Sequence, residues 1–160
     1  MFLDNALMNT VRDLRNASAH SNCIINKMGE RLDATKQPKS ELILFVRHHG
    51  VSNQSATTNM NCKFAYNIVT LLYVYDLLVQ EAPKQKRYAQ LKEFMNDRVV
   101  RNGDYFKSNS KICSTYNFLK KVIDNLNWLM YNGSTLEKHM KAFVRSGTSN
   151  DVPLLILFIR

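Results

Sequence analysis

The chain has 160 residues, 45% of them apolar and 22% charged, with only 5 Gly and 3 Pro to interrupt regular structure. A chain of this length buries about two-thirds of the surface that it exposes when unfolded, so we expect one globular domain and exclude a disordered chain. Its 22 Lys and Arg exceed its 13 Asp and Glu and give a formal net charge of +9. This excess favours an anionic partner, with nucleic acid ahead of a membrane surface, and the alternative is a basic surface without a partner.

The three cysteines, Cys23, Cys62 and Cys113, lie far apart, without a C-x-x-C pair or a histidine at zinc-ligand spacing. We therefore expect neither a disulfide framework nor a zinc site, and no other cofactor. The first residues do not form a basic segment followed by an apolar one, so no secretory signal is predicted. The longest apolar run, 154–159, is too short to cross a bilayer, and the expectation is a soluble protein of a reducing cytoplasm.

The first predicted helix covers residues 2–14, in which apolar residues recur at helical spacing with polar residues between them. A weaker helical pattern follows at residues 24–32. Gly29 and Pro38 then bracket a polar connection, because both residue types interrupt helices.

A second helical pattern lies between Ser40 and Gly50. Ser40 is a suitable N-cap for a short helix over residues 41–49, and Gly50 is a suitable stop. Residues 51–61 (VSNQSATTNMN) are small, polar and without a period, which predicts an exposed and mobile loop.

Residues 62–79 are the most apolar stretch of the chain, and in a helix their apolar side chains would cover nearly the whole circumference. Such a helix either forms the centre of the core or lies in a subunit interface. Its aromatic side chains could stack on bases, but in so apolar a helix they are usually core.

Two further helices are predicted after Pro83. Residues 84–100 present one apolar face, and a turn at 102–104 ends this segment. Residues 111–131 then carry apolar side chains at steps of three and four, which again predicts a helix with one buried face.

The last predicted elements complete an all-α fold. Ser134 and Glu137 have the spacing of a capping box, which predicts the start of a final helix. The apolar tail at 154–159 is either a strand or a packed extended segment. The sum is a helical bundle of about six helices, since alternating strand patterns are essentially absent.

Arg15 and His20 are the candidate catalytic residues. Cutting RNA without a metal ion requires a group that exchanges protons with the reacting oxygens and a cation that stabilises charge on the phosphorus. Histidine exchanges protons near neutral pH, and arginine stays charged and contacts phosphate through a bidentate fork. In an unbroken helix residues five apart point about 140° away from each other, so we expect a break within residues 16–19, where Asn and Ser bond locally to the backbone.

The surrounding segment, 14–22, reads Leu-Arg-Asn-Ala-Ser-Ala-His-Ser-Asn. It resembles the R-x4-6-H motif of HEPN-type proteins and, in detail, the Arg-Asn-x-x-Ala-His signature of the bacterial abortive-infection (Abi) family. The resemblance is close over these residues and is one of helical pattern elsewhere. It implies a single HEPN-like helical domain over residues 1–160, which is either the whole protein or the C-terminal part of a longer one.

The resemblance also implies an activity and an assembly. A protein of this family would be a metal-independent endoribonuclease in phage defence or the toxin of a toxin–antitoxin pair, with RNA as substrate and an antitoxin protein or RNA as a further partner. It would form a homodimer that brings two copies of the motif into one cleft, and two-fold dimers are also the commonest oligomers. Arg15 and His20 would be catalytic, and Asn16 would orient them or bind phosphate.

Three more arginines are expected to contact the RNA backbone, namely Arg12, Arg47 and Arg101. The basic stretches around Lys84 and Arg98 either follow the same backbone or form a solvated face.

Each cluster of Arg and His also has a purely structural interpretation. Arg15 and His20 would complement the dipole at the C-terminus of a helix. Arg47, His48 and His49 would form a cationic helix end, because adjacent side chains point apart on a helix.

Two other classes of function are compatible with the sequence. In one, the chain is a non-catalytic module that binds RNA or acts as a scaffold through its basic surface. In the other, it is a helical adaptor that binds proteins through the apolar helix at 62–79.

Overall fold

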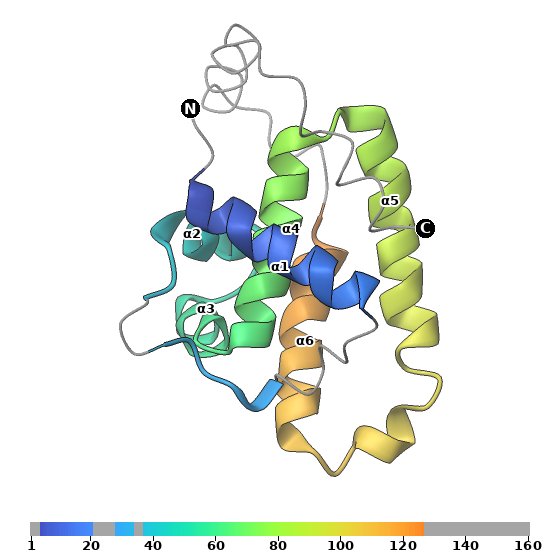
Figure 1. Cartoon of the computed structure of the whole chain (residues 1–160). Helices are drawn as coiled ribbons and strands as arrows, with labels where there is room; N and C mark the ends of the chain where they lie inside the picture. Colours follow the sequence, from blue (N-terminus) through green and yellow to red (C-terminus); the bar gives the residue numbers. More distant parts are fainter. Residues whose placement is uncertain (1–3, 21–27, 34–36, 127–160) are drawn as a thin grey trace, which may run out of the picture.

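The computed structural model describes residues 4–20, 28–33 and 37–126, and in these ranges the chain forms an all-α bundle without a strand (Figure 1). Within these ranges there are six α-helices, and a π-helical turn and a 3-10 turn connect the last two. The elements are α1 (Asn5–Ala19), α2 (Ser40–His48), α3 (Asn53–Met60), α4 (Lys63–Leu78), α5 (Glu81–Glu93), η2 (Phe94–Arg98), η3 (Gly103–Phe106) and α6 (Ser110–Asp124).

α4 is the central helix of the bundle, and α1, α2, α3 and α6 all pack against it (Figure 1). Every residue of α4 is buried or half-buried, because apolar side chains cover nearly its whole circumference. The helix expected at 62–79 is confirmed, and it forms the centre of the core. Its fully buried residues are Ala65, Val69, Thr70 and Val74.

α1 packs on α4 through one face of an amphipathic helix. The Asp4 side chain caps its start by accepting a hydrogen bond from the Ala6 N–H at 2.8 Å. The helix ends at Ala19 rather than at residue 14, so it is longer than expected. Its buried residues are Leu7, Val11 and Leu14.

α2 agrees with the helix expected at 41–49, although Ser40 is its first helical residue rather than its N-cap. Gly50 ends it as expected, in the left-handed backbone region with φ of 81°. The Gly50 N–H bonds the Arg47 carbonyl at 3.0 Å, and the Val51 N–H bonds the Val46 carbonyl at 3.2 Å. These two bonds, with both valines buried, form a Schellman motif.

α3 contradicts the expectation of an exposed, mobile loop at 51–61. The Ser52 side chain caps this helix by accepting a hydrogen bond from the Ser55 N–H at 3.3 Å. Ala56 and Met60, four residues apart, are fully buried, and the helix packs on α2, α4 and α6. Burial of one narrow face against three neighbours therefore stabilises a helix whose composition is that of a loop.

α5 begins at Glu81, so Pro83 lies in its first turn, where a proline costs no helical hydrogen bond. Lys84 is buried, and its ammonium lies 3.1 Å from the carboxylate of Asp76 on α4. The Tyr88 hydroxyl donates to the same carboxylate at 2.7 Å. Because a buried charge requires such partners, Lys84 joins α5 to α4, and the prediction that it lies on an RNA-binding or solvated face is wrong.

The helix expected at 84–100 changes geometry at Phe94, where η2 begins. Val99 donates its N–H to the Phe94 carbonyl at 3.1 Å, five residues back. This wider turn shifts the apolar face, so that Met95 is buried while Phe94 is exposed. η3 then occupies the turn expected near residues 102–104.

The Asn109 side chain caps α6 by accepting hydrogen bonds from the N–H groups of the second and third helical residues, both at 3.1 Å. The helix ends at Asp124, earlier than the expected 131. Of the weaker pattern at 24–32, the described part is not α-helical, and Arg31 forms a β-bridge with Cys62 instead. The predictions for Cys23, for the helix after Ser134 and for the tail at 154–159 lie outside the described residues.

Candidate functional site

The C-terminal half of α1 carries four of the predicted site residues. Arg12, Arg15 and His20 are exposed, and Asn16 is half-buried. The apolar face of α1 is turned toward α4, so these polar side chains lie on the rest of the helix surface. The local sequence therefore collects two guanidinium groups, an amide and an imidazole at one exposed helix end.

The expected helix break within residues 16–19 is wrong, because α1 runs unbroken through Ala19. The His20 N–H still bonds the Asn16 carbonyl at 3.0 Å, which is regular α-helical geometry. Two alanines are good helix formers and offset the weaker propensity of Asn and Ser. Arg15 and His20 therefore point about 140° apart within one copy, and no hydrogen bond joins them.

His20 shares its side of α1 with Arg12 and Asn16. These three residues follow one another at steps of four, which places them within about 80° of each other on an α-helix. Arg15 lies at the edge of this row, and its Nη1 donates a hydrogen bond to the Asn16 Oδ1 at 3.0 Å. In one copy the cation on the side of His20 is thus Arg12, while Asn16 holds the Arg15 guanidinium in place.

Arg47 and Arg101 lie on other elements of the fold. Arg47 is in the last turn of α2 and is exposed. Arg101 follows η2 and pairs with the Asp97 carboxylate at 2.8 Å, where both side chains are largely exposed. In the described part of the chain, no hydrogen bond or ion pair connects either arginine to the end of α1.

The cationic helix end expected at 47–49 is only partly correct. Arg47 and His48 are exposed, but His49 is buried. Its Nδ1 lies 2.7 Å from the Phe45 carbonyl, and the two ring centroids are 4.4 Å apart. Burial lowers the pKa of His49, so this imidazole is a neutral member of the core at neutral pH.

A polar cleft of about 540 Å³ lies between α3, which the sequence predicted as a loop, and α6. Serine hydroxyls and asparagine amides line it, and its one charged residue is Lys121. It contains no histidine or carboxylate, so it lacks an acid–base pair. The lining residues are Val51, Ser52, Ser55, Asn59, Ser110, Cys113, Ser114, Asn117, Phe118 and Lys121.

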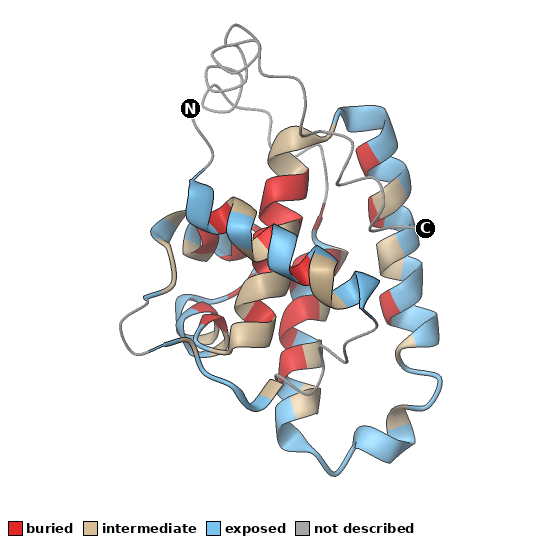
Figure 2. Ribbon diagram, viewed as in Figure 1, coloured by how far each residue is buried: buried red, intermediate tan, exposed pale blue. Residues whose placement is uncertain are grey.

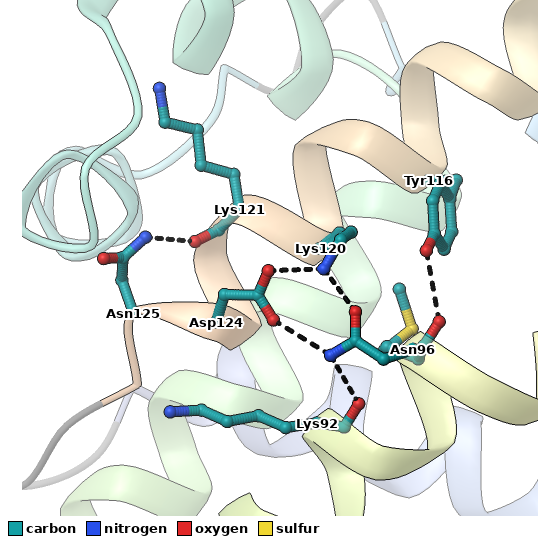
Figure 3. A network of polar contacts seen from close by, with 8 residues as sticks. Lys92, Asn96, Tyr116, Lys120, Lys121, Asp124 and Asn125 are labelled. Carbon is teal, nitrogen blue, oxygen red and sulfur yellow. Dashed lines mark hydrogen bonds and ion pairs between the residues drawn. The ribbon is translucent and has the colours of Figure 1, made fainter.

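A network of polar contacts fixes η2 against α6 (Figure 3). The Lys120 ammonium donates to the Asn96 side-chain oxygen and, at 2.6 Å, to the Asp124 carboxylate. The Tyr116 hydroxyl donates to the Met95 carbonyl at 3.1 Å. The hydrogen bond from Lys120 lowers the pKa of Asp124, so the carboxylate stays charged and the network stays intact near neutral pH.

Comparisons of this chain with protein-family models, with curated proteins and with solved structures find no match. In the part of the chain that the structure describes, no group of three or more His, Cys, Asp or Glu side chains could hold a metal ion. No helix there has both the length and the hydropathy to cross a bilayer.

Proposed function

We propose that the chain is a HEPN-type, metal-independent endoribonuclease that acts in the cytoplasm as a phage-defence effector or toxin. One observation carries this proposal: Arg12, Arg15 and His20 gather at an exposed helix end that gives them no part in the core. None of the three forms an ion pair with another described residue. Proton exchange by His20 and phosphate binding by Arg15 are the two functions that RNA cleavage needs.

The catalytic pair comes from two copies of the chain in this proposal. Because α1 is unbroken, the Arg15 and His20 of one copy point away from each other. A two-fold axis beside the end of α1 brings the Arg15 of one copy to the His20 of the other, and it does so twice. His20 then acts as general acid or base, Arg15 stabilises the charge on the phosphorane, and Asn16 orients Arg15.

The first test is RNA cleavage by single variants. We expect His20→Ala to lower the cleavage rate by about 10²–10⁴-fold and Arg15→Ala by about 10²–10³-fold. Arg15→Lys should restore only part of the rate, because lysine lacks the bidentate fork. The products should carry 2′,3′-cyclic phosphates, and a chelator should leave the rate unchanged.

His48→Ala is the matched control, since His48 is also an exposed histidine at the end of a helix. It should cleave like the wild type. Wild-type rates in both His20→Ala and Arg15→Ala would overturn the catalytic assignment, and loss of activity on chelation would point to a metal nuclease.

Mixing two inactive variants tests whether the pair spans two copies. In a mixed dimer of Arg15→Ala and His20→Ala chains, one of the two composite sites keeps both residues. After subunit exchange we expect about a quarter of the wild-type activity to return, since half of the dimers are mixed. If each site belonged to a single chain, no activity would return.

The two alternative functions differ in how they fit the fold. The adaptor interpretation required an accessible surface on the helix at 62–79, and α4 buries that surface in the core. A non-catalytic RNA-binding module remains the second candidate, and it would bind RNA in a salt-sensitive way without cutting it.

A further inference from the structure

The segment between α5 and α6 exposes an unusual amount of apolar surface. We call residues 94–107 the α5–α6 corner. Of the five large hydrophobic side chains exposed in the described part of the chain, the corner holds four, and Leu44 on α2 is the fifth. Tyr105 is 82% exposed, and Figure 2 shows nearly the whole corner as exposed. The other three are Phe94 at 46%, Val100 at 44% and Phe106 at 47%.

The corner is held in place by hydrogen bonds and by one buried side chain rather than by its aromatic residues. Met95 is buried, and its carbonyl accepts the hydrogen bond from Tyr116 of α6. Asn96 belongs to the network with Lys120 and Asp124 (Figure 3). Because α6 anchors the corner in this way, its aromatic rings stay outside the core, and their exposure calls for a partner.

The charges of the corner identify the chemistry of that partner. Arg98, Arg101 and Lys107 lie in the same 14 residues as the exposed rings, whereas the acidic residues there are Asp97 and Asp104. Arg101 pairs with Asp97 and Lys107 pairs with Asp104, which leaves Arg98 without an ion pair to any described residue. Exposed aromatic rings with interspersed cations are the two features by which proteins hold single-stranded nucleic acid.

We propose that the α5–α6 corner binds single-stranded RNA, with Tyr105 and Phe106 stacking on unpaired bases and Arg98 contacting the phosphates. The inference rests on the proposed function only in taking RNA as the natural strand, and it does not require cleavage. Duplex nucleic acid does not fit the corner, because its bases are already stacked and offer no free faces to the rings. A strand held here would extend the contacts of the protein with its substrate beyond the end of α1.

The test measures binding of short fluorescent oligothymidylate DNA, which a 2′-hydroxyl mechanism cannot cut, alongside oligouridylate RNA. The double variant Tyr105→Ala, Phe106→Ala should bind either strand about tenfold more weakly or worse, because each lost stack on a base is costly. Tyr105→Phe keeps the ring and should bind like the wild type. Arg98→Ala should flatten the slope of log affinity against log salt by about 0.7.

Leu44→Ala is the matched control, because Leu44 is equally apolar and exposed but lies outside the corner. It should leave affinity unchanged, and a duplex of the same length should bind wild type and double variant alike. The corner proposal is overturned if the wild type does not bind single strands or if the double variant binds them as well as the wild type does. Two other results would also overturn it. If the double variant changes only the oligomeric state, the corner is a surface for a second copy of the chain. If it changes only the melting temperature, the corner is covered by the chain's own residues.

The two proposals fail separately. If binding depends on Tyr105 but the protein does not cut RNA, the corner proposal is supported and the ribonuclease proposal is refuted. If cleavage depends on His20 but affinity does not depend on Tyr105, the ribonuclease proposal is supported and the corner proposal is refuted.

Discussion

The C-terminal ends of α1 and α2 carry the same residue types in opposite surroundings. His20 ends α1 on the exposed side of the helix, in one row with Arg12 and Asn16. His49 ends α2 and is buried, with its ring against Phe45 and its Nδ1 on a backbone carbonyl. One histidine is exposed to solvent, and the other is part of the core.

The turn after α2 accounts for the burial of His49. Gly50 reverses the chain in the left-handed region, and Val51 packs beside Val46. This Schellman motif leads directly into α3, which lies against α2 and helps to enclose its end. The packing around a helix end, rather than the Arg and His themselves, therefore decides whether the imidazole is buried in the core or exposed to solvent.

The largest stability difference between the two ends should come from removing each histidine. His49→Ala leaves a cavity and removes the imidazole contact with the Phe45 carbonyl, so we expect the free energy of unfolding to fall by about 2 kcal/mol. His20→Ala should change it by less than about 0.5 kcal/mol, as for other exposed residues. Urea unfolding of both variants measures the difference. Equal effects of the two substitutions would show that the buried histidine contributes no more to stability than the exposed one.

A smaller effect is expected at Gly50, whose φ of 81° disfavours any side chain. Gly50→Ala should lower the free energy of unfolding by about 1–2 kcal/mol, since an L-residue is strained there. An added Cβ would also meet the Asn125 amide at 3.4 Å. Gly103→Ala is the control, because its Cβ would meet nothing within 4 Å and its φ is not left-handed. A loss of stability as large in Gly103→Ala would show that strain at Gly50 is not the cause.

Much of the fold was predictable because strong periodicity dominates local structure. The apolar residues of 62–79 leave no helix face for solvent, so the pattern allowed α4 only the core or a subunit interface, and its packing against four helices places it in the core. Gly50 likewise marked the end of α2, since few other residues adopt its backbone conformation.

α3 could not be predicted, because its only apolar side chains on the buried face are those of Ala56 and Met60. Two residues give no measurable period, and Ser, Thr and Asn dominate the rest of the segment. Its helix depends on neighbours from α2, α4 and α6, which no local pattern contains. The cleft between α3 and α6 was missed for the same reason.

The candidate site was predictable as a set of residues but not as a geometry. Arg15, Asn16 and His20 stood out by chemistry and resemblance, but the helix break that would join Arg15 to His20 is absent. Whether Asn and Ser break a helix depends on the backbone around them, and here the hydrogen bonds continue to His20. The exposure of the rings in the α5–α6 corner could not be predicted, because Phe94 and Met95 both belong to the apolar pattern of 84–100. The π-helical turn η2 separates them, so that Met95 is buried and Phe94 is exposed.

The smallest effect that separates the two helix ends is the pH dependence of stability. Burial lowers the pKa of His49 in the folded chain below its ordinary value of 6.5. The bond to the Phe45 carbonyl and the charge of Asp76 oppose this shift, and the neighbouring His48 adds to it weakly. As the pH falls below 6.5 the unfolded chain therefore takes up a proton first, and the free energy of unfolding decreases by at most about 1.4 kcal/mol per pH unit. Above 6.5 this contribution is fully present. Urea unfolding between about pH 5 and 7 should show the decrease in the wild type and in His48→Asn. His49→Asn should remove it, because the asparagine amide nitrogen replaces Nδ1 at the Phe45 carbonyl without titrating. If His49→Asn kept the full slope, the titrating group would lie elsewhere, and the contrast between a buried and an exposed histidine would lose its physical basis.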